Sequence, residues 1–404
     1  MLLLLMSALL ATACLASGFT VGGGRWTPHG DALGGTPADQ ASRFRVFWQA
    51  WHVVEGQFYA TDPLDPQQMT YGAIAGLLAA LGDPYAGFSN PPAHRLENDS
   101  FSGDFGGIGA SLAIDNGIVA LSTVHPLSPA EAAGLRSGDR LLAVDGIALQ
   151  TTSLDELALA IRGSPGSTVR LDVQRQGQPL TFGVVRATVE LPSVWWQALA
   201  SGLGYIRIER FSGRTPAEVG LALNELQTAG AKALLLDLRD NAGGLAATAS
   251  GVLAQLLDGG IAYREMSRDG QEQRIAIPFG VVRASTLPLA VLVNHGTASA
   301  AEIVAAAVQD HGRGPLVGEH TYGKGSVQIL HTLSDGSSIR ITTTRWLTPS
   351  GSPIEGVGLL PDIVTAPDQD AVAQGCLYLA QSAGTRLDCT GQLTPNEETG
   401  KVLV

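Results

Sequence analysis

Apolar and polar residues alternate differently in three regions of the chain. In residues 42–59 apolar side chains recur every three or four positions, so they share one face of a predicted helix. A second helix is predicted where the run MTYGAIAGLLAALG begins at Met69. We expect the first helix to pack in a core or an interface, and its aromatic residues suggest a homodimer through the N-terminal helices. The stripe consists of Phe44, Phe47, Trp48, Trp51, Val54 and Phe58.

Residues 103–190 contain short runs of β character, separated by Gly and Asp turns, and a helix near residues 153–163. Ser153 is the expected N-cap of that helix, with Glu156 three residues later. Many small barrels share this pattern. However, the run SPAEAAGLRSGDRLLAVDG, which begins at Ser128, closely resembles the PDZ signature.

The PDZ resemblance implies a domain that adds an extended peptide to a sheet edge. Such a domain receives the C-terminal carboxylate of its ligand on backbone N–H groups of a Gly-rich loop. Here the loop would consist of Gly106, Gly107, Ile108 and Gly109. A plain tight turn is the alternative for this glycine cluster. The resemblance favours the binding loop, and with it protein or peptide partners that have free C-termini.

From Leu191 onward strands and helices alternate. The runs ALLLD and LPLAVLVN are almost entirely apolar. Continuous apolar strands between helices predict an α/β fold whose sheet is largely parallel and covered on both faces. Residues 365–404 show little pattern and are interpreted as a C-terminal tail.

The N-terminal segment is an apolar run from Leu2 to about Phe19. It has the character of a secretory signal peptide or a single membrane anchor, although no Lys or Arg precedes it. Cys14 loosely resembles a lipoprotein attachment site. Each alternative exports the rest of the chain, so we expect a periplasmic or extracellular protein that meets the membrane only through this segment.

Composition narrows the classes of function. The 404 residues are 45% hydrophobic and 15% charged, which is ample material for two or three globular domains. The net charge of −12 argues against a nucleic-acid partner, which would require a basic face. No CxxC, HExxH or Asp-rich calcium motif occurs, so no metal site and no other cofactor is predicted. Cys376 and Cys389 either form a disulfide in an oxidising compartment or are two unrelated thiols.

One glycine-rich run, GEHTYGKGS, nearly matches a nucleotide-binding loop. It begins at Gly318 and contains Gly323 and Lys324 at the required spacing. Gly325, however, stands where that loop needs Ser or Thr for magnesium. A β-like run follows, whereas the loop must open a helix whose N-terminus binds phosphate. We therefore reject nucleotide binding.

A Ser-His-Asp hydrolase is a second alternative. His295 lies four residues before Ser299, and Asp237 and Asp310 are available as the acid. The chain has no Gly-x-Ser-x-Gly elbow, and His295 follows a strand, where a solvated loop residue is the simpler interpretation. We regard the triad as the weaker hypothesis.

Ser299 and Lys324 form the third candidate site. Ser299 precedes an apolar helix, and Glu302 three residues later makes a capping box the simplest interpretation of both. The helix dipole at Ser299 also favours developing negative charge. Lys324 follows the next strand, and consecutive parallel strands end at one edge of a sheet, so the two side chains can converge. A desolvated lysine has a lowered pKa and, when neutral, accepts a serine proton; an arbitrary lysine would be a solvated surface residue.

Five runs in this part of the chain resemble, in order, the motifs of the C-terminal processing peptidases, also called tail-specific proteases. They are YIRIERF, LLLDLRDNAGG, VLVNHGTASAAEIVAAAVQD, GEHTYGKGSVQ and GLLPDIVT. The run YGAIAGLLAALGDPYAGF and the intervening PDZ domain also resemble this family. The resemblance covers residues 42 to about 364 and implies a protease core of the ClpP/crotonase type.

The same resemblance implies catalytic roles for the matching residues. Ser299 would be the nucleophile, Lys324 the general base, and Gln328 would orient the lysine amine. The backbone N–H groups of Gly244 and Ala300 would form the oxyanion hole.

Acidic residues of the same helix match positions with supporting roles in the family, namely Glu302 and Asp310. Two residues depart from the common pattern, Thr297 and Ala301, and neither carries the chemistry. The departures therefore leave the implied mechanism intact.

We predict an exported serine endopeptidase that captures an apolar, unstructured C-terminal tail with its PDZ domain and cleaves upstream through an acyl-enzyme. The alternative is a non-catalytic PDZ scaffold on a decayed protease core, against which the retention of Ser299, Lys324 and Gln328 argues. The expected organisation is a signal peptide or anchor (1–24), a linker (25–40), an N-terminal helical region (41–102), a PDZ domain (103–190), a protease core (191–364) and a tail (365–404).

Overall fold

The computed structural model describes most of the chain from residue 38 onward. The described ranges are 38–59, 62–115, 117–149, 153–199, 202–281, 283–284, 286–366, 369–384, 387 and 402–404. The predicted signal or anchor segment, most of the linker, Cys14 and Cys389 lie outside them. None of the helices in these ranges is both long and apolar enough to cross a membrane. The chain divides into two units, residues 1–70 and 71–404.

Helix α2 (Ala38–Gln57) belongs to the first unit and carries the predicted aromatic stripe. Its rings contact one another: the centroids of Phe47 and Trp48 are 5.2 Å apart, and those of Trp48 and Trp51 are 6.0 Å apart. The stripe is not buried, since Phe44 and Trp48 are each 52% exposed and Phe58 is 63% exposed. The stripe is therefore not buried in a core among the described residues, and its packing in an interface stays a prediction. Helix α3 (Pro66–Ala79) follows.

The second unit is built on a six-stranded sheet of order β10-β11-β12-β15-β16-β19. Strand β10 is antiparallel to β11, and the remaining neighbours are parallel, as predicted. The strands are β10 (Val194–Ala198), β11 (Leu203–Ile208), β12 (Ala233–Asp237), β15 (Leu289–Val293), β16 (Leu316–Gly318) and β19 (Ile363–Val364).

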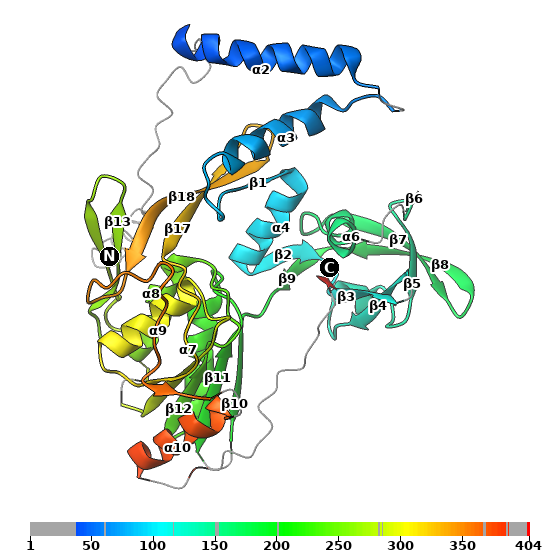
Figure 1. Cartoon of the computed structure of the whole chain (residues 1–404). Coiled ribbons are helices and arrows are strands. Elements are labelled where there is room, and N and C mark those ends of the chain that lie inside the picture. Colours follow the sequence, from blue (N-terminus) through cyan, green and yellow to red (C-terminus); the bar gives the residue numbers. More distant parts are fainter. Residues whose placement is uncertain are drawn as a thin grey trace, which may run out of the picture. The chain divides into compact units, whose positions relative to one another are not determined.

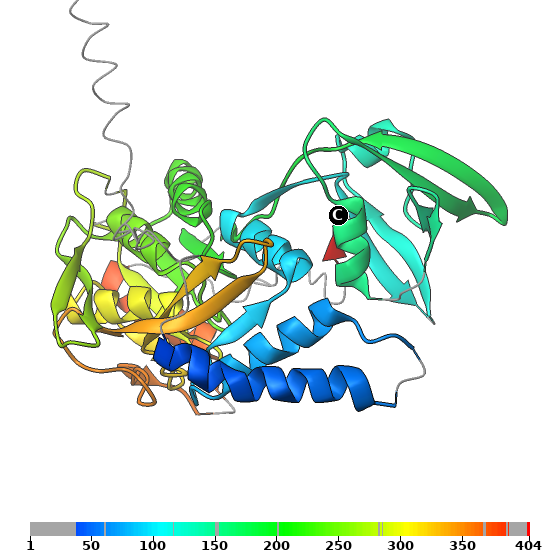
Figure 2. The same cartoon turned by 90° about the horizontal axis from the view of Figure 1, so that it is seen from above.

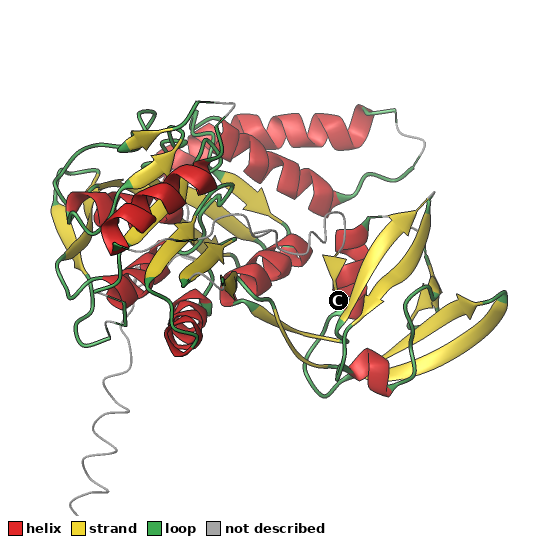
Figure 3. Ribbon diagram, turned by 90° about the horizontal axis from the view of Figure 1, so that it is seen from below, coloured by secondary structure: helices red, strands yellow, loops and turns green. Residues whose placement is uncertain are grey.

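Helices cover both faces of this sheet (Figures 1 and 3) because successive side chains of each strand point to opposite faces. Leu234 and Leu236 share an apolar cluster with residues of α7 (Thr215–Thr228), α8 (Ala246–Leu256) and α9 (Ala300–Asp310). Leu235, between them, belongs to the cluster of α10 (Ala371–Ala383) on the other face.

Helix α10 lies in the segment in which the sequence showed little pattern. Ala371, Cys376 and Leu379 are buried against the sheet, and Asp370 caps the helix by accepting the N–H of Val372 at 2.9 Å. Cys376 is fully buried and disulfide-bonded. Its partner lies outside the described residues, so the pairing with Cys389 stays a prediction.

A second sheet supplies part of the functional site. It runs from β1 (Gly87–Ser89) through β18 (Ser338–Leu347) and β13 (Ile261–Ser267) to β14 (Glu272–Ala276). Strand β17 (Ser326–Thr332) pairs antiparallel with β18. The segment that carries Lys324 therefore connects the end of β16 to the start of a strand in the second sheet. Helix α4 (Pro91–Ser102) follows β1.

Between α4 and β10 the chain forms the expected PDZ barrel (Figure 2), whose apolar core is a cluster of its own. Strand β2 (Asp104–Gly107) pairs with β9 (Ala187–Glu190). Ser153 caps α6 (Leu154–Ile161), since its hydroxyl accepts the N–H of Glu156 at 3.4 Å. The other elements are β3 (Ala110–Asp115), β4 (Ile118–Val124), α5 (Pro129–Ala132), β5 (Arg140–Val144), β6 (Ile147–Ala148), β7 (Thr168–Arg175) and β8 (Gln178–Val185).

Candidate active site

Ser299 lies in the turn between β15 and α9 with a backbone conformation that side chains rarely adopt. Its φ and ψ are 56° and −119°. A non-glycine residue in such a conformation carries about 1–3 kcal/mol of strain, which the surrounding structure must hold. Gly243 packs directly on this turn: a Cβ at Gly243 would lie 2.8 Å from the Ser299 Cβ and 2.8 Å from the Ala298 oxygen. Only glycine permits this approach.

Two backbone N–H groups beside Ser299 are available as donors. Those of Gly244 and Ala300 make no hydrogen bond to any residue that the structure describes. The N–H of Gly243, by contrast, donates to the Asn241 side chain at 2.8 Å. Phe211 fixes the turn by donating its N–H to the Gly243 oxygen at 2.9 Å. Free N–H groups on both sides of a serine are what a developing oxyanion requires.

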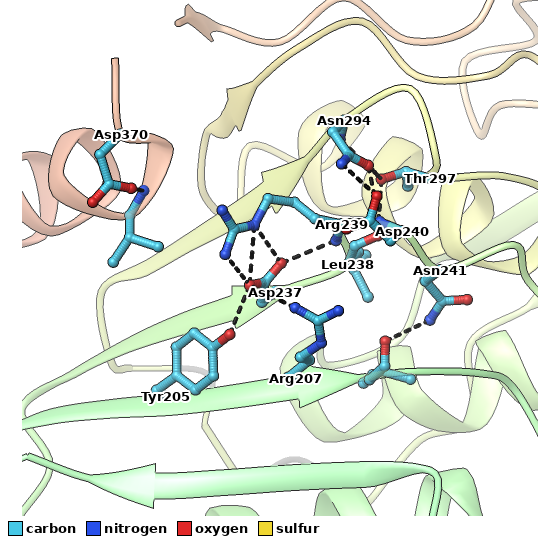
Figure 4. A network of polar contacts seen from close by, with 12 residues as sticks. Tyr205, Arg207, Asp237, Leu238, Arg239, Asp240, Asn241, Asn294, Thr297 and Asp370 are labelled. Carbon is cyan, nitrogen blue, oxygen red and sulfur yellow. Dashed lines mark hydrogen bonds and ion pairs between the residues drawn. The ribbon is translucent and has the colours of Figure 1, made fainter. Parts of the chain in front are cut away.

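A polar network at the end of β12 fixes the start of this glycine turn (Figure 4). The buried Asp237 accepts hydrogen bonds from the Tyr205 hydroxyl at 2.7 Å and from the Arg239 guanidinium at 2.6 Å. Burial, together with the Asp237 charge, raises the pKa of Tyr205, so the phenol keeps its donor proton. Asp237 was a candidate acid of the alternative triad, and its carboxylate is instead used to hold the turn.

The same network joins the glycine turn to the turn that carries Ser299 (Figure 4). The Asn294 side chain accepts the N–H of Asp240 at 2.9 Å and donates to its carboxylate at 2.8 Å. The Thr297 hydroxyl donates to the Leu238 oxygen at 2.8 Å. The two turns are therefore one hydrogen-bonded body, although more than fifty residues separate them in the sequence.

Glu302 connects Ser299 to the loop of Lys324. It forms a capping box with Ser299, as the sequence indicated, and is fully buried. One carboxylate oxygen accepts the N–H of Ser299 at 2.9 Å and the N–H of Lys324 at 2.9 Å. The other accepts the Thr321 hydroxyl at 2.6 Å and the N–H of Gly323 at 2.7 Å. One charge therefore positions both halves of the site.

Ser299, Lys324, Gln328 and Gly244 line one cavity of about 670 Å³. No hydrogen bond joins the Ser299 hydroxyl to the Lys324 amine within the described ranges. The Gln328 amide donates to the hydroxyls of Ser326 and Thr342, each at 3.0 Å. The cavity therefore collects Ser299, Lys324, Gln328 and Gly244, which the sequence singled out, without a hydrogen bond between the serine and the lysine in the described residues.

The surroundings of Lys324 favour its neutral form. Its amine lies 4.8 Å from the centroid of the Tyr85 ring. Burial, and next the positive charge of Arg340, lower the pKa of Lys324 from its ordinary value. Glu355 and Asp83 act in the opposite direction. The net effect makes this amine a base at lower pH than an exposed lysine.

Tyr85 and Arg340 were not among the predicted site residues. Tyr85 lies in the run GDPYAGF, which carried part of the family resemblance but gave no role for the tyrosine. Arg340 lies on β18 and donates to Glu97 at 2.7 Å. Its place in the cavity depends on the pairing of β17 with β18, a hairpin whose turn contains Asp335 and Gly336, but nothing in the sequence gave the arginine a role.

Two other predicted residues lie away from the cavity. Asp310 ends α9, about 16 Å along the helix from Ser299, and accepts the N–H of Ser350 at 2.7 Å. The His295 side chain is 75% exposed and lies 3.7 Å from Glu319. Neither lines the cavity, so no Ser-His-Asp triad is assembled there. The structure also gives no support to nucleotide binding by the run that begins at Gly318, because the strand β17 follows this run rather than a helix.

The glycine-rich loop of the PDZ domain divides into two parts. Gly106 and Gly107 belong to β2 and pair with Thr188 and Ala187 of β9. Ile108 and Gly109 follow in the turn before β3, and their N–H groups point at one acceptor oxygen. Only the second half of the predicted loop therefore has N–H groups that donate to a chain end rather than to β9.

Comparison with known proteins gives matches along most of the chain. The model of peptidase family S41 matches residues 202–365, and a PDZ-domain model matches residues 121–175. A carboxyl-terminal-processing protease of Picosynechococcus sp. is 37% identical over 324 residues, 78% of this chain and 77% of that protein. The carboxy-terminal processing protease CtpA of Bacillus subtilis is 32% identical over 361 residues, 88% of this chain and 75% of the relative. Among solved structures, a photosystem II D1 C-terminal processing protease is 31% identical, with 87% and 100% of the two chains covered and a TM-score of 0.48.

The α/β core with its PDZ domain is that of a serine-type peptidase. With 37% identity over 78% of its length, the chain belongs to peptidase family S41, among the carboxyl-terminal-processing proteases. The predicted family and fold class are confirmed. The roles of single residues are not tested by these matches and stay predictions.

Replacing Glu302 by Gln should lower the free energy of unfolding by about 3 kcal/mol, because the amide offers one acceptor oxygen to four donors. Turnover of a peptide substrate should fall about tenfold or more, since the Lys324 loop loses its anchor. Urea unfolding and steady-state hydrolysis measure the two effects. Glu319→Gln, whose side chain is 42% exposed, is the matched control and should change neither. Equal effects of the two substitutions would contradict the role of Glu302.

Proposed function

We propose that this protein is a serine endopeptidase that forms an acyl-enzyme on Ser299 and uses Lys324 as the general base. The observation that carries the proposal is the shared cavity: both side chains line it, and Glu302 binds the backbone of both residues. The lowered pKa of Lys324 adds support, because only a neutral amine accepts the serine proton. The unpaired N–H groups of Gly244 and Ala300 are the matching oxyanion donors.

In the proposed reaction the neutral Lys324 amine takes the proton of Ser299 while Oγ attacks the carbonyl carbon of the peptide. Gly244 and Ala300 donate to the oxyanion that forms. As the C–N bond breaks, the Lys324 ammonium returns this proton to the leaving amine, and the acyl group stays on Oγ. A water molecule, deprotonated by the same amine, then attacks the ester and releases Ser299 with its proton restored.

Substrate binding completes the pair in this proposal. Catalytic hydrogen bonds that are long or absent in a free enzyme often form in the substrate complex. The Ser299 hydroxyl and the Lys324 amine share a cavity without such a bond, and Gln328 is held by Ser326 and Thr342. Gln328 orients the lysine amine only after it releases these hydroxyls, so its contribution is smaller than that of the lysine.

The PDZ domain is proposed to select substrates by an apolar, unstructured C-terminal tail. The N–H groups of Ile108 and Gly109 suit a terminal carboxylate, and the edge of β3 opposite β4 pairs with an extended segment. The relatives named carboxyl-terminal-processing proteases accord with this class of substrate. The tail is then held while the chain upstream of it enters the cavity of Ser299.

A non-catalytic PDZ scaffold is the alternative function, and covalent labelling separates the two. We expect a fluorophosphonate probe to modify the wild-type chain on Ser299, because an activated serine attacks the phosphorus atom. Ser299→Ala should not be labelled, and Ser326→Ala, which removes another serine of the same cavity, should still be labelled. Labelling is read by intact mass. Absence of labelling in the wild type would favour the scaffold.

Lys324→Arg keeps a positive charge and stays protonated near neutrality, so its turnover should fall to the level of Lys324→Ala.

Wild-type acylation should rise with pH along one ionisation and then level off. Removing the charge of Arg340 removes a cause of the lowered lysine pKa, so Arg340→Gln should move this rise to higher pH. Pre-steady-state acylation rates between about pH 6 and 10 measure the shift.

Two control substitutions accompany this series. Arg345→Gln changes an exposed arginine of the same strand and should leave the pH profile in place. His295→Ala should leave turnover largely intact, because His295 lies outside the cavity. Near-normal turnover of Lys324→Arg, together with loss of turnover in His295→Ala, would instead support a Ser-His mechanism.

The N-terminal region is proposed to export the protein and to dimerise it through the exposed aromatic face of α2. Protein from its native compartment should lack residues 1 to about 13 or stay membrane-bound through them, which intact mass decides.

The dimer is tested separately. Sedimentation velocity should give a dimer that Trp48→Glu dissociates. A full-length, freely soluble chain would contradict export, and a monomeric wild type would contradict the dimer.

A further inference from the structure

The end of the chain occupies the groove between β3 and α6 of the PDZ domain (Figure 2). Strand β20 (Val402–Leu403) is antiparallel to β3, with Val402 opposite Leu112 and Leu403 opposite Ser111. The pairing continues where the N–H of Val404 donates to the Ala110 oxygen at 2.7 Å. Residues 402–404 are therefore the added strand that this groove is built to receive.

Three backbone N–H groups converge on the Val404 oxygen. Ile108, Gly109 and Ala110 donate to it at 3.2, 2.7 and 3.1 Å. Convergent N–H groups in a turn form a site for an anion, here the carboxylate of a chain end. The close approach also requires glycine before the turn, since a Cβ at Gly107 would lie 2.9 Å from the Val404 carbonyl carbon.

The Val404 side chain is fully buried and belongs to the apolar core of the PDZ domain. The same cluster includes Ile108 and Leu112 from the β3 side and Leu157 and Ile161 from α6. Strand pairing, carboxylate contacts and an aliphatic pocket are three separate features. Together they specify a ligand with a free C-terminus and a small aliphatic last residue.

We infer that residues 402–404 are a ligand in cis of the PDZ domain, and that they keep its groove closed until a substrate tail displaces them. Occupancy by the chain's own end stands without the proposed function, whereas displacement by substrate rests on it. The sequence 388–401 tethers this end to the rest of the chain. A tethered ligand acts at an effective concentration on the order of millimolar, so it raises the apparent dissociation constant of every competing tail.

Hydrogen exchange of the Ser299→Ala chain tests occupancy without any added ligand. Intact mass first verifies that the chain ends at Val404. The amides of residues 108–112 should be protected in this chain and should lose protection when residues 402–404 are deleted. Unchanged protection after the deletion would overturn the inference. Protection that is lost on dilution, with oligomers that need the tail, would assign the occupant to a second copy and also overturn it.

Peptide binding tests displacement. The probe is fluorescein-labelled Thr-Gly-Lys-Val-Leu-Val, the sequence of residues 399–404, measured by anisotropy with the Ser299→Ala chain. Deletion of residues 402–404 should lower the apparent dissociation constant about tenfold or more, and the amidated peptide should bind the deleted chain more weakly.

Two substitutions of the same kind make this binding experiment specific. Val404→Asp keeps the chain length but places a charge in an apolar pocket, so it should act like the deletion. Val185→Asp, at a 57% exposed position of the same domain, should leave peptide affinity unchanged. If the deletion exposes the amides but the peptide binds neither form, occupancy stands and the proposed recruitment of substrate tails fails. If affinity is equal with and without residues 402–404, the displacement part is wrong.

Discussion

A single buried carboxylate sets the geometry on which the active site depends. Burial of an unpaired carboxylate is strongly unfavourable, and four donors converge on the buried Glu302. One of these donors lies in the turn before α9, and the others lie in the loop after β16. The charge is therefore satisfied only when both segments are in place. The backbones of Ser299 and Lys324 are thus positioned by the same side chain.

Nearby carboxylates, Glu355 first among them, limit how far the pKa of Lys324 is lowered. Burial and Arg340 lower the pKa of Lys324, whereas Glu355, Asp83 and Glu302 stabilise its ammonium form. If burial alone acted on Lys324, its pKa would be so low that the amine would take up a proton poorly. If the carboxylates alone acted on it, its pKa would be so high that the ammonium would give up its proton poorly. Opposed causes suit the role proposed for Lys324, which takes a proton in one step and returns it in the next.

The sequence predicted the parts of this site that follow from topology. Consecutive parallel strands end at one edge, and β15 and β16 deliver Ser299 and Lys324 there. It also indicated Ser299 and Glu302 as a local capping box. It did not indicate that Glu302 binds Thr321 and Gly323, because those contacts join segments about twenty residues apart and depend on how the loop after β16 folds back.

Helix α10 and the ligand of the PDZ groove were missed for a related reason. Gly375 interrupts the helix pattern in a segment with few large apolar residues. The glycine packs closely on the sheet, since a Cβ there would lie 2.9 Å from the Leu235 side chain, which would have to shift. Val404 likewise looks unremarkable in the sequence, and its role depends on a groove formed some three hundred residues earlier. Local patterns predict elements, whereas these two features depend on contacts between distant segments.

If the PDZ domain selects substrates by a free C-terminus, as proposed, residues 402–404 compete with them for the same site. Placing Val404 in its own PDZ groove keeps that end away from the cavity of Ser299. It also sets a threshold, because specificity is a difference of affinities and every incoming tail is compared with the tethered one. A tail that lacks the carboxylate or the aliphatic last residue binds more weakly than residues 402–404 and does not displace them. In this proposal the tethered Val404 is the competitor that each substrate tail must displace from the N–H groups of residues 108–110, so a substitution at Val404 would alter which tails reach the cavity of Ser299.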